Sequence, residues 1–339
     1  MLSRHGIRSL CCAAVTTAIL GMSGITSAAD EVKIGFLVKQ AEEPWFQTEW
    51  QFAEKAGKEL GFTVIKIAVP DGEKTLSAID NLAANGVKGF VICPPDVSLG
   101  PAIVAKAKAK ANGMKVMAVD DRFVDASGKP MEDVPYLGMA AFEVGQKQGA
   151  AMATEAKNRK WDEGEWKNTY AIINTYSELD TGKKRTDGSV DALKKAGLPA
   201  DHILFSPQKT LDVPGGMDAT NSALPKLPRE AKNLIIGGMN DNTVLGGVRA
   251  TSGAGFSAKN VIGIGINGTD AIDELKKKES GFFGSMLPSP DKEGYRTAEY
   301  VFNWVTKGVE PPKYTAMDDV TLITRENFQA ELTKIGLWK

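Results

Sequence analysis

From Val32 onward, apolar runs rich in β-branched residues alternate with amphipathic segments of helical period. One such segment, Leu76–Gly86, places Leu76, Ile79, Leu82 and Ala83 on one stripe and ends in Asn-Gly, a common helix stop. The alternation predicts repeated strand–helix units and a parallel sheet. The predicted strands are Val32–Val38, Thr63–Val69, Gly89–Pro94, Lys115–Asp120, Pro135–Met139, Asn168–Thr175, Ile203–Pro207, Asn233–Gly238, Val261–Ile266 and Phe282–Met286.

Ten strands exceed one open sheet of ordinary size, so the pattern predicts two doubly wound, Rossmann-like α/β lobes. The main break falls near Asp121–Pro135, a polar stretch that departs from the strand–helix rhythm. Two Pro-rich breaks follow, at Ser285–Tyr295 and Glu310–Asp319. Three crossings between lobes predict a hinge, because a few extended segments can absorb the rotation of one lobe against the other.

The first thirty residues differ in composition from the rest. Arg4, His5 and Arg8 precede an apolar run and then small residues, which is the pattern of a secretory signal peptide at residues 1–29. A membrane anchor is the alternative, but the apolar run is short for a span. Cleavage after Ala29 removes two arginines and changes the formal net charge from −1 to −3. It leaves Cys93 as the single cysteine, which excludes an internal disulfide and a cysteine-rich metal site.

Unusual polar and aromatic residues follow several predicted strands, where ligands bind in open α/β sheets. In the loop after the first strand they are Lys39, Glu43, Trp45 and Phe46; later ones are Asp120, Asp121, Arg185, Met239, Asn240, Asp241 and Asn267. Each also has an ordinary explanation: the aspartates and asparagines as caps or turns, Arg185 as a solvated charge, the aromatics and methionines as core.

Taken together, these residues favour a neutral polyhydroxyl ligand. Lysine and arginine donate hydrogen bonds, carboxylates accept them, amides do both, and an aromatic ring packs on the C–H face of a sugar. The near-zero net charge and the absence of a basic block in the sequence argue against nucleic acid or a membrane surface as partner.

The sequence lacks the common motifs for phosphate binding and for metal binding. The chain contains no phosphate loop, no H-E-x-x-H and no C-x-x-C, so we expect no metal and no cofactor. His202 is the one histidine after the predicted signal and lies in a turn. A glycosidase could use Asp120 and Asp121 with Glu43, but no activated nucleophile is evident, so the chain is expected not to be an enzyme.

Seven segments carry a resemblance to a known family: "KIGFLVKQAEEPWFQTEW", "VPDGEKTLSAIDNLAANGVKGFVICPPD", "MKVMAVDDRF", "SELDTGKKRTDGSVDALKKAGLP", "IIGGMNDNTVLGGVRATSGAGF", "VIGIGINGTDAIDEL" and "GFFGSMLPSPDKEGY". Over essentially the whole mature chain, the sequence resembles the L-arabinose-binding proteins of Gram-negative bacteria, a group of the type I periplasmic binding proteins. It departs from their usual pattern at Ala41 and Gly182, at two lysines after Gly182, and in a slightly longer "KAKAKANGM".

The resemblance implies a monomeric periplasmic receptor that closes on one L-arabinose, or on D-galactose or D-fucose, and delivers it to an ABC transporter permease. A chemotaxis receptor as second partner stays open. The implied lobes are 30–138 with 286–316 and 139–285 with 317–339, with the sugar in the cleft between them. The implied sugar contacts are Lys39, Glu43, Trp45, Phe46, Asp120, Asp121, Met139, Arg185, Met239, Asn240 and Asn267. Behind them the resemblance implies Cys93, Leu179, Thr181 and Asp270.

Two other readings remain open at this point. The chain could bind galactose, ribose or xylose in place of arabinose. It could also be the regulatory core of a sugar-responsive repressor, although it lacks an N-terminal DNA-binding helix pair and carries the signal sequence in its place.

Overall fold

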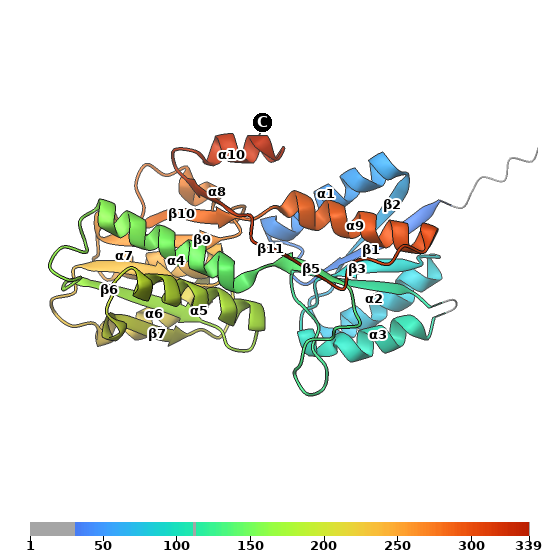
Figure 1. Ribbon diagram of the computed structural model, residues 1–339, viewed down its shortest axis with the longest axis horizontal. Coiled ribbons are helices and arrows are strands. Elements are labelled where there is room, and N and C mark those ends of the chain that lie inside the picture. Colours follow the sequence, from blue (N-terminus) through green and yellow to red (C-terminus); the bar gives the residue numbers. More distant parts are fainter. Residues whose placement is uncertain (1–30, 111–112, 339) are drawn as a thin grey trace, which may run out of the picture. The chain divides into compact units, whose positions relative to one another are not determined.

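The computed structural model describes residues 31–110 and 113–338, so the predicted signal peptide lies outside the described residues. The described chain forms two lobes, each with a parallel-dominated sheet and flanking helices (Figure 1). The predicted fold class is therefore confirmed. Among the described residues, no helix combines the length and the hydropathy needed to span a bilayer.

The first lobe is built on a six-stranded parallel sheet in the order β2-β1-β3-β4-β5-β11. Its strands are β1 (Val32–Val38), β2 (Phe62–Ala68), β3 (Gly89–Ile92), β4 (Lys115–Val119), β5 (Tyr136–Met139) and β11 (Tyr314–Met317). Its helices are α1 (Pro44–Leu60), α2 (Gly72–Ala84), the 3-10 turn η1 (Val97–Leu99), α3 (Gly100–Lys108) and α9 (Pro290–Lys307).

The second lobe has a sheet in the order β7-β6-β8-β9-β10-β12, parallel except that β12 runs antiparallel to β10. Its strands are β6 (Thr169–Thr175), β7 (Ile203–Pro207), β8 (Asn233–Gly237), β9 (Val261–Ile266), β10 (Phe282–Leu287) and β12 (Thr321–Thr324). Its helices are α4 (Ala141–Asn158), α5 (Asp180–Lys195), α6 (Val213–Ala223), α7 (Asp241–Gly253), α8 (Ile272–Leu275) and α10 (Phe328–Lys334), with 3-10 turns η2 (Ala200–His202), η3 (Leu224–Lys226) and η4 (Ala258–Asn260).

The chain passes between the two sheets three times: after β5, after β10 and between β11 and β12. All ten predicted strands are present, most with ends shifted by a residue. Reading Glu310–Asp319 only as a break was wrong, because Tyr314–Met317 forms β11 and pairs with β5. The strand was missed because it is short, lies at a sheet edge and leaves Tyr314 55% exposed, so it has no apolar run.

Helix α1 shows how local sequence sets an element. Pro44 stands at its first position, where proline's missing N–H costs no hydrogen bond. The helix ends at Gly61, whose φ of 83° lies in the left-handed region that favours glycine. Its buried side, which includes Trp50, Phe52 and Ala53, packs toward β1 and against α9. The first residues of α1 are thereby held close to the end of β1.

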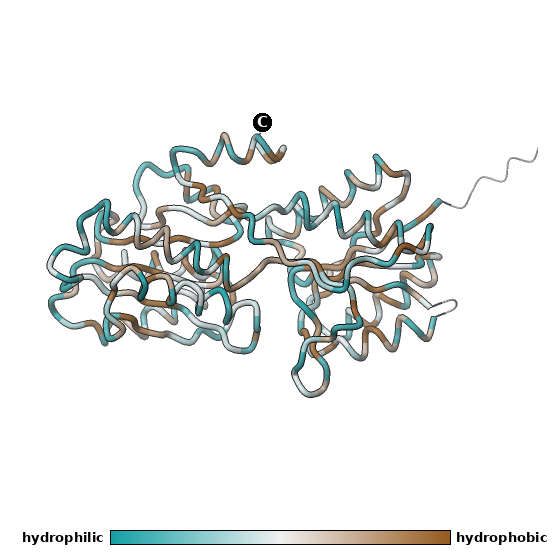
Figure 2. Tube along the Cα trace, in the orientation of Figure 1, coloured by the Kyte–Doolittle hydropathy of each residue, from teal (hydrophilic) through white to brown (hydrophobic). Residues whose placement is uncertain are grey.

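The strands form the centre of each lobe's core. β3, β5 and β9 are buried along their whole length, as expected where helices cover both faces of a parallel sheet. Figure 2 shows these hydrophobic stretches along the strands, with polar residues concentrated on the helices and loops around them. Polar side chains that are nevertheless buried, such as those following β4, therefore stand out as candidate site residues.

Candidate functional site

The site residues predicted after β1 divide between a short loop, residues 39–43, and the start of helix α1. Lys39 directly follows the strand, whereas Trp45 and Phe46 are the second and third residues of α1 and are 1% and 2% exposed. The expectation of a loop is therefore confirmed for Lys39 and Glu43 and wrong for Trp45 and Phe46, because the helix begins at Pro44. Trp45 Nε1 is buried and has no hydrogen-bond partner within residues 31–110 and 113–338, so this indole N–H is an unused donor.

Asp121 is held by one residue from each lobe. Lys39 Nζ donates to Asp121 Oδ2 at 2.5 Å, and Thr181 Oγ1, from the first turn of α5, donates to Oδ1 at 2.7 Å. Burial alone would raise the pKa of Asp121, but the Lys39 ammonium and these two donors hold it below its usual value. The carboxylate therefore stays ionised. Burial lowers the pKa of Lys39, but Asp121, with Cys93 and Asp120, raises it above its usual value.

Asp120 forms the second interlobe contact. Arg185 Nη2 donates to Asp120 Oδ1 at 3.3 Å, and Arg185 Nη1 donates to the backbone oxygen of Met239 at 3.1 Å. Asp120 has a φ of 60°, and its backbone oxygen accepts a hydrogen bond from the Tyr136 hydroxyl at 2.9 Å. Arg185 is 4% exposed, and its Nε has no hydrogen-bond partner in the part of the chain that the structure describes. The guanidinium thus retains a buried donor after both contacts are made.

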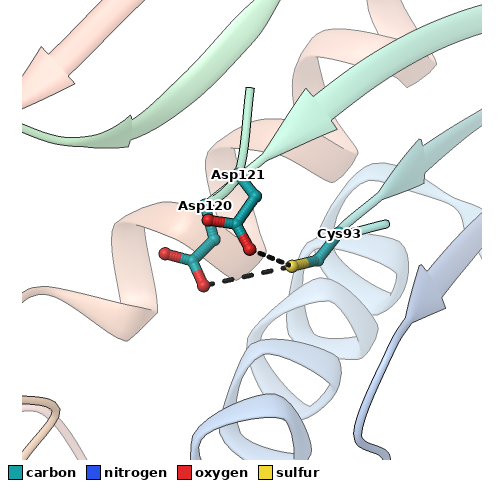
Figure 3. Close-up of side chains that lie close together, drawn as sticks. All are labelled: Cys93, Asp120 and Asp121. Atoms are coloured by element: carbon teal, nitrogen blue, oxygen red, sulfur yellow. Dashed lines mark hydrogen bonds between the residues drawn. The ribbon is translucent and has the colours of Figure 1, made fainter. Parts of the chain in front are cut away.

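Cys93 lies beside both aspartates. Its Sγ is 4.0 Å from Asp120 Oδ2 and 3.8 Å from Asp121 Oδ2, as Figure 3 shows. Such a trio could ligate a metal on distance alone. Burial raises the pKa of the thiol, however, and the Lys39 ammonium already contacts the Asp121 oxygen that faces the sulfur. One of the three groups is therefore already paired with a cation of the protein itself.

The second lobe contributes amides and a further carboxyl. Asn240 is the N-cap of α7: its Oδ1 accepts from the Thr243 N–H at 2.9 Å, and its Nδ2 donates to Leu211 O at 3.0 Å. The capping explanation for Asn240 is therefore confirmed, and it leaves one amide proton available. Asn267 follows β9 with a φ of 122° and hydrogen-bonds Asp270 through its side chain. Met139 ends β5 and is 4% exposed.

Glu43 connects the two lobes more weakly. Its Oε1 accepts from Gln40 at 2.8 Å and from Asn242 of the second lobe at 3.4 Å. Burial raises the pKa of Glu43 to about 7, and the negative Asp270 adds to the rise. Burial also raises the pKa of Asp270, to about 6. These two carboxyls therefore change charge close to neutral pH.

A cavity of about 290 Å³ adjoins these contacts. Asp121, Met139, Leu179 and Thr181 line one part of it, and Arg122, Tyr136 and Tyr314 line another. Of the two buried ion pairs, only Asp121 lines this cavity, and the predicted sugar contacts other than Asp121 and Met139 do not line it. Trp45 and Arg185 each keep a buried donor without a partner among the described residues. Such an arrangement can hold a polar molecule by hydrogen bonds.

Sequence reasoning missed two polar side chains near these elements. Gln208 directly follows β7 and is 7% exposed, yet neither its side-chain nitrogen nor its side-chain oxygen has a hydrogen-bond partner among the described residues. Asn242, inside the first turn of α7, reaches Glu43. Gln208 could have been found by the rule that polar residues after strands matter. Asn242 could not, because its contact depends on how the lobes meet.

The sequence matches the family model described as periplasmic binding proteins and sugar binding domain of LacI family over residues 31–331. It is 58% identical over 324 residues to the L-arabinose-binding periplasmic protein of Escherichia coli K12, covering 94% of this chain and 97% of that protein. It is 43% identical over 336 residues to the ABC transporter L-arabinose-binding periplasmic protein of Azospirillum brasilense, covering 98% of each.

Solved structures agree on the fold. A solute-binding protein from Agrobacterium radiobacter, in complex with D-arabinose, superposes with a TM-score of 0.68 at 20% identity, covering 91% of this chain and 98% of that one. A galactofuranose-binding protein gives 0.70 at 18% identity, covering 89% and 98%. The family match, the two close relatives and the shared fold together place this chain in the family of the periplasmic binding proteins and the sugar-binding domain of the LacI family.

Proposed function

We propose that this protein is a periplasmic receptor for L-arabinose, and for D-galactose and D-fucose as close analogues, which delivers the sugar to an ABC transporter permease. The names of its two close relatives support this choice of ligand, compartment and partner. The observation in the structure that carries it is the pair of buried contacts Lys39–Asp121 and Arg185–Asp120. They bring charged donors and acceptors of both lobes together, and one of them, Asp121, lines the adjoining cavity.

In this proposal the sugar lies in the cleft between the lobes 30–138 with 286–316 and 139–285 with 317–339. Charged side chains bind the hydroxyls, and the Trp45 and Phe46 rings cover the apolar face of the pyranose. The proposed contacts are Lys39, Glu43, Trp45, Phe46, Asp120, Asp121, Met139, Arg185, Met239, Asn240 and Asn267, supported by Cys93, Leu179, Thr181 and Asp270.

The mature receptor is proposed to act as a monomer, exported by a signal peptide at residues 1–29, and to bind its sugar without chemical change. Both relatives are named as binding proteins, which supports a non-catalytic role. A chemotaxis receptor is a second candidate partner, and a pull-down with sugar-loaded protein would identify either membrane partner.

Calorimetry tests the ligand. The mature chain from Asp30 is unfolded and refolded to remove bound sugar, then titrated with L-arabinose, D-galactose, D-ribose and D-xylose. We expect one-to-one binding of arabinose, weaker binding of galactose and silence with ribose and xylose, because galactose differs from arabinose by one hydroxymethyl group, worth about 1–3 kcal/mol in a pocket. Tight ribose or xylose binding, or silence with all four sugars, would contradict the proposal. Turnover of the sugar after long incubation would contradict the non-catalytic role.

A further inference from the structure

Two glutamates that the proposed sugar site does not use face each other between α1 and α9. Glu49 lies in the second turn of α1 and Glu293 in the first turn of α9, and both are fully buried at 0% exposure. The two helices run side by side (Figure 1). They approach closely at Gly294, where a Cβ would lie 2.3 Å from the backbone oxygen of Glu49.

The four carboxyl oxygens of this pair lack donors. Among the described residues, no side chain or backbone N–H donates to Oε1 or Oε2 of either glutamate. The two carboxyls are hydrogen-bonding neighbours of each other once one of them carries a proton. Ionised carboxylates can only accept, whereas a protonated carboxyl both donates and accepts, so protons would supply the missing donors.

The charged groups around the pair also favour its protonated form. The groups that act on it are Lys39 after β1, Asp120 and Asp121 after β4, Arg185 on α5, and the thiol of Cys93 and hydroxyl of Tyr136. Lys39 and Arg185 are the two cations of this set, and each already pairs with an aspartate. No cation of the set remains for the glutamates, so ionisation of the pair would bury charge without compensation.

Burial raises the pKa of Glu49 well above its usual value, with Glu293 adding to it. Burial likewise raises the pKa of Glu293, with Asp120 adding. Protonating a buried carboxyl costs far less than keeping an unpaired charge away from water.

We propose that Glu49 and Glu293 form a carboxylic acid pair that keeps its protons at neutral pH and thereby sets the charge beneath the proposed sugar site. With the pair neutral, the positive charges of Lys39 and Arg185 act on Asp121 and Asp120. With the pair ionised, two more carboxylates compete for the same two cations. The pair is thus a positioning element for the Asp120–Arg185 contact. Its effect on sugar affinity rests on the proposed function, whereas its protonation does not.

The variants Glu293→Gln and Glu49→Gln test the protons without sugar, because glutamine has the shape of a neutral glutamic acid. A raised pKa in the folded protein means that the wild type loses stability as pH rises from the unfolded pKa towards the folded one. Each variant lacks the share of this loss that belongs to the carboxyl it replaces. Urea titrations between about pH 5 and pH 8 should therefore show the folding constant of each variant gaining on the wild type by up to about tenfold per pH unit.

Glu299→Gln is the matched control: it makes the same substitution on the same helix, at a residue that is only partly buried and outside the pair, and it should not reproduce the gain seen in the pair variants. Loss of stability in both pair variants by the same amount at all pH values would overturn the proposal. So would stabilisation of the wild type, but not of the variants, by added CaCl₂ or NaCl, because the pair would then hold a cation.

Two further readings complete the test. The infrared carboxylic acid C=O band of the wild type near pH 7.5 should weaken in either variant, and its absence from the wild type would overturn the proposal even if a variant does not fold. From about pH 5 to pH 8, the affinity for L-arabinose should fall more in the wild type than in Glu293→Gln. If no sugar binds, the proposed function fails while the urea and infrared results still decide the state of the pair.

Discussion

At the scale of single residues, the candidate site depends on which carboxyls stay ionised. Asp120 and Asp121 are neighbours in sequence and both are buried, yet they behave differently. Burial raises the pKa of Asp120, with Asp121 adding, whereas Lys39 and Thr181 hold that of Asp121 low. Their adjacency after a strand was visible in the sequence. The difference in their partners depends on side chains about sixty and eighty residues away.

Asp121→Asn should weaken L-arabinose binding by about ten- to a hundredfold, because a hydrogen bond to a charged group contributes about 1.5–3 kcal/mol and Lys39 would lose its counter-charge. Calorimetry at neutral pH measures this. Asp273→Asn is the control: its side chain is 93% exposed and pairs with Lys276 on the surface, so binding should not change. If Asp121→Asn and Asp273→Asn bind L-arabinose with equal affinity, Asp121 does not contribute to sugar binding.

At the scale of elements, the position of Arg185 depends on close contact between α4 and α5. A Cβ on Gly145 would lie 2.0 Å from the backbone oxygen of Arg185, and one on Gly188 would lie 2.1 Å from that of Phe142. Ser189 Oγ donates to Gly145 O at 3.1 Å across the same contact. The two backbones therefore touch, which sets how far α5 carries Arg185 towards Asp120.

Gly145→Ala should lower the free energy of unfolding by about 1–3 kcal/mol, because the methyl group meets backbone that cannot move independently. It should also weaken sugar binding through a displaced Arg185. Urea unfolding and calorimetry measure the two effects. Gly253→Ala, in α7, meets nothing within 4 Å and should be neutral or stabilising by up to about 1 kcal/mol. If Gly145→Ala is as stable as this control, the helix contact is looser than the structure indicates.

At the scale of the whole molecule, buried carboxyls with raised pKa outnumber those held low. Burial raises the pKa of Asp241 and of Asp120, in addition to those of Glu43 and Asp270. Apart from the buried Asp121, carboxyls whose pKa is lowered, such as Asp80 and Asp125, lie at the surface, and a carboxyl with a lowered pKa loses its contribution only in acid. The free energy of unfolding should therefore decrease as pH rises above about pH 5.

The sugar-free protein should be more stable near pH 5.5 than near pH 8. A carboxyl whose folded pKa is raised loses its contribution as pH rises through that pKa, and for Glu43, at about 7, this loss is about 1–2 kcal/mol across the interval. Urea titrations at the two pH values measure it. Glu43→Gln should reduce the difference, and greater stability at pH 8 than at pH 5.5 would contradict the expectation.

Much of this protein followed from its sequence alone. The β-branched runs and helical stripes determined ten strands and the two-lobed α/β fold, because strands buried on both faces need continuous apolar side chains. The same pattern located Lys39, Asp120, Asp121 and Asn267 at strand ends, where the sheet topology gathers side chains.

Only the tertiary structure decided how those side chains pair. It placed Trp45 inside a helix, made a strand of Tyr314–Met317, and brought Arg185 to Asp120 and Glu49 to Glu293. Local patterns record whether a residue is buried and in which element. They do not record which distant group meets it, and the charge of a buried carboxyl depends on that neighbour.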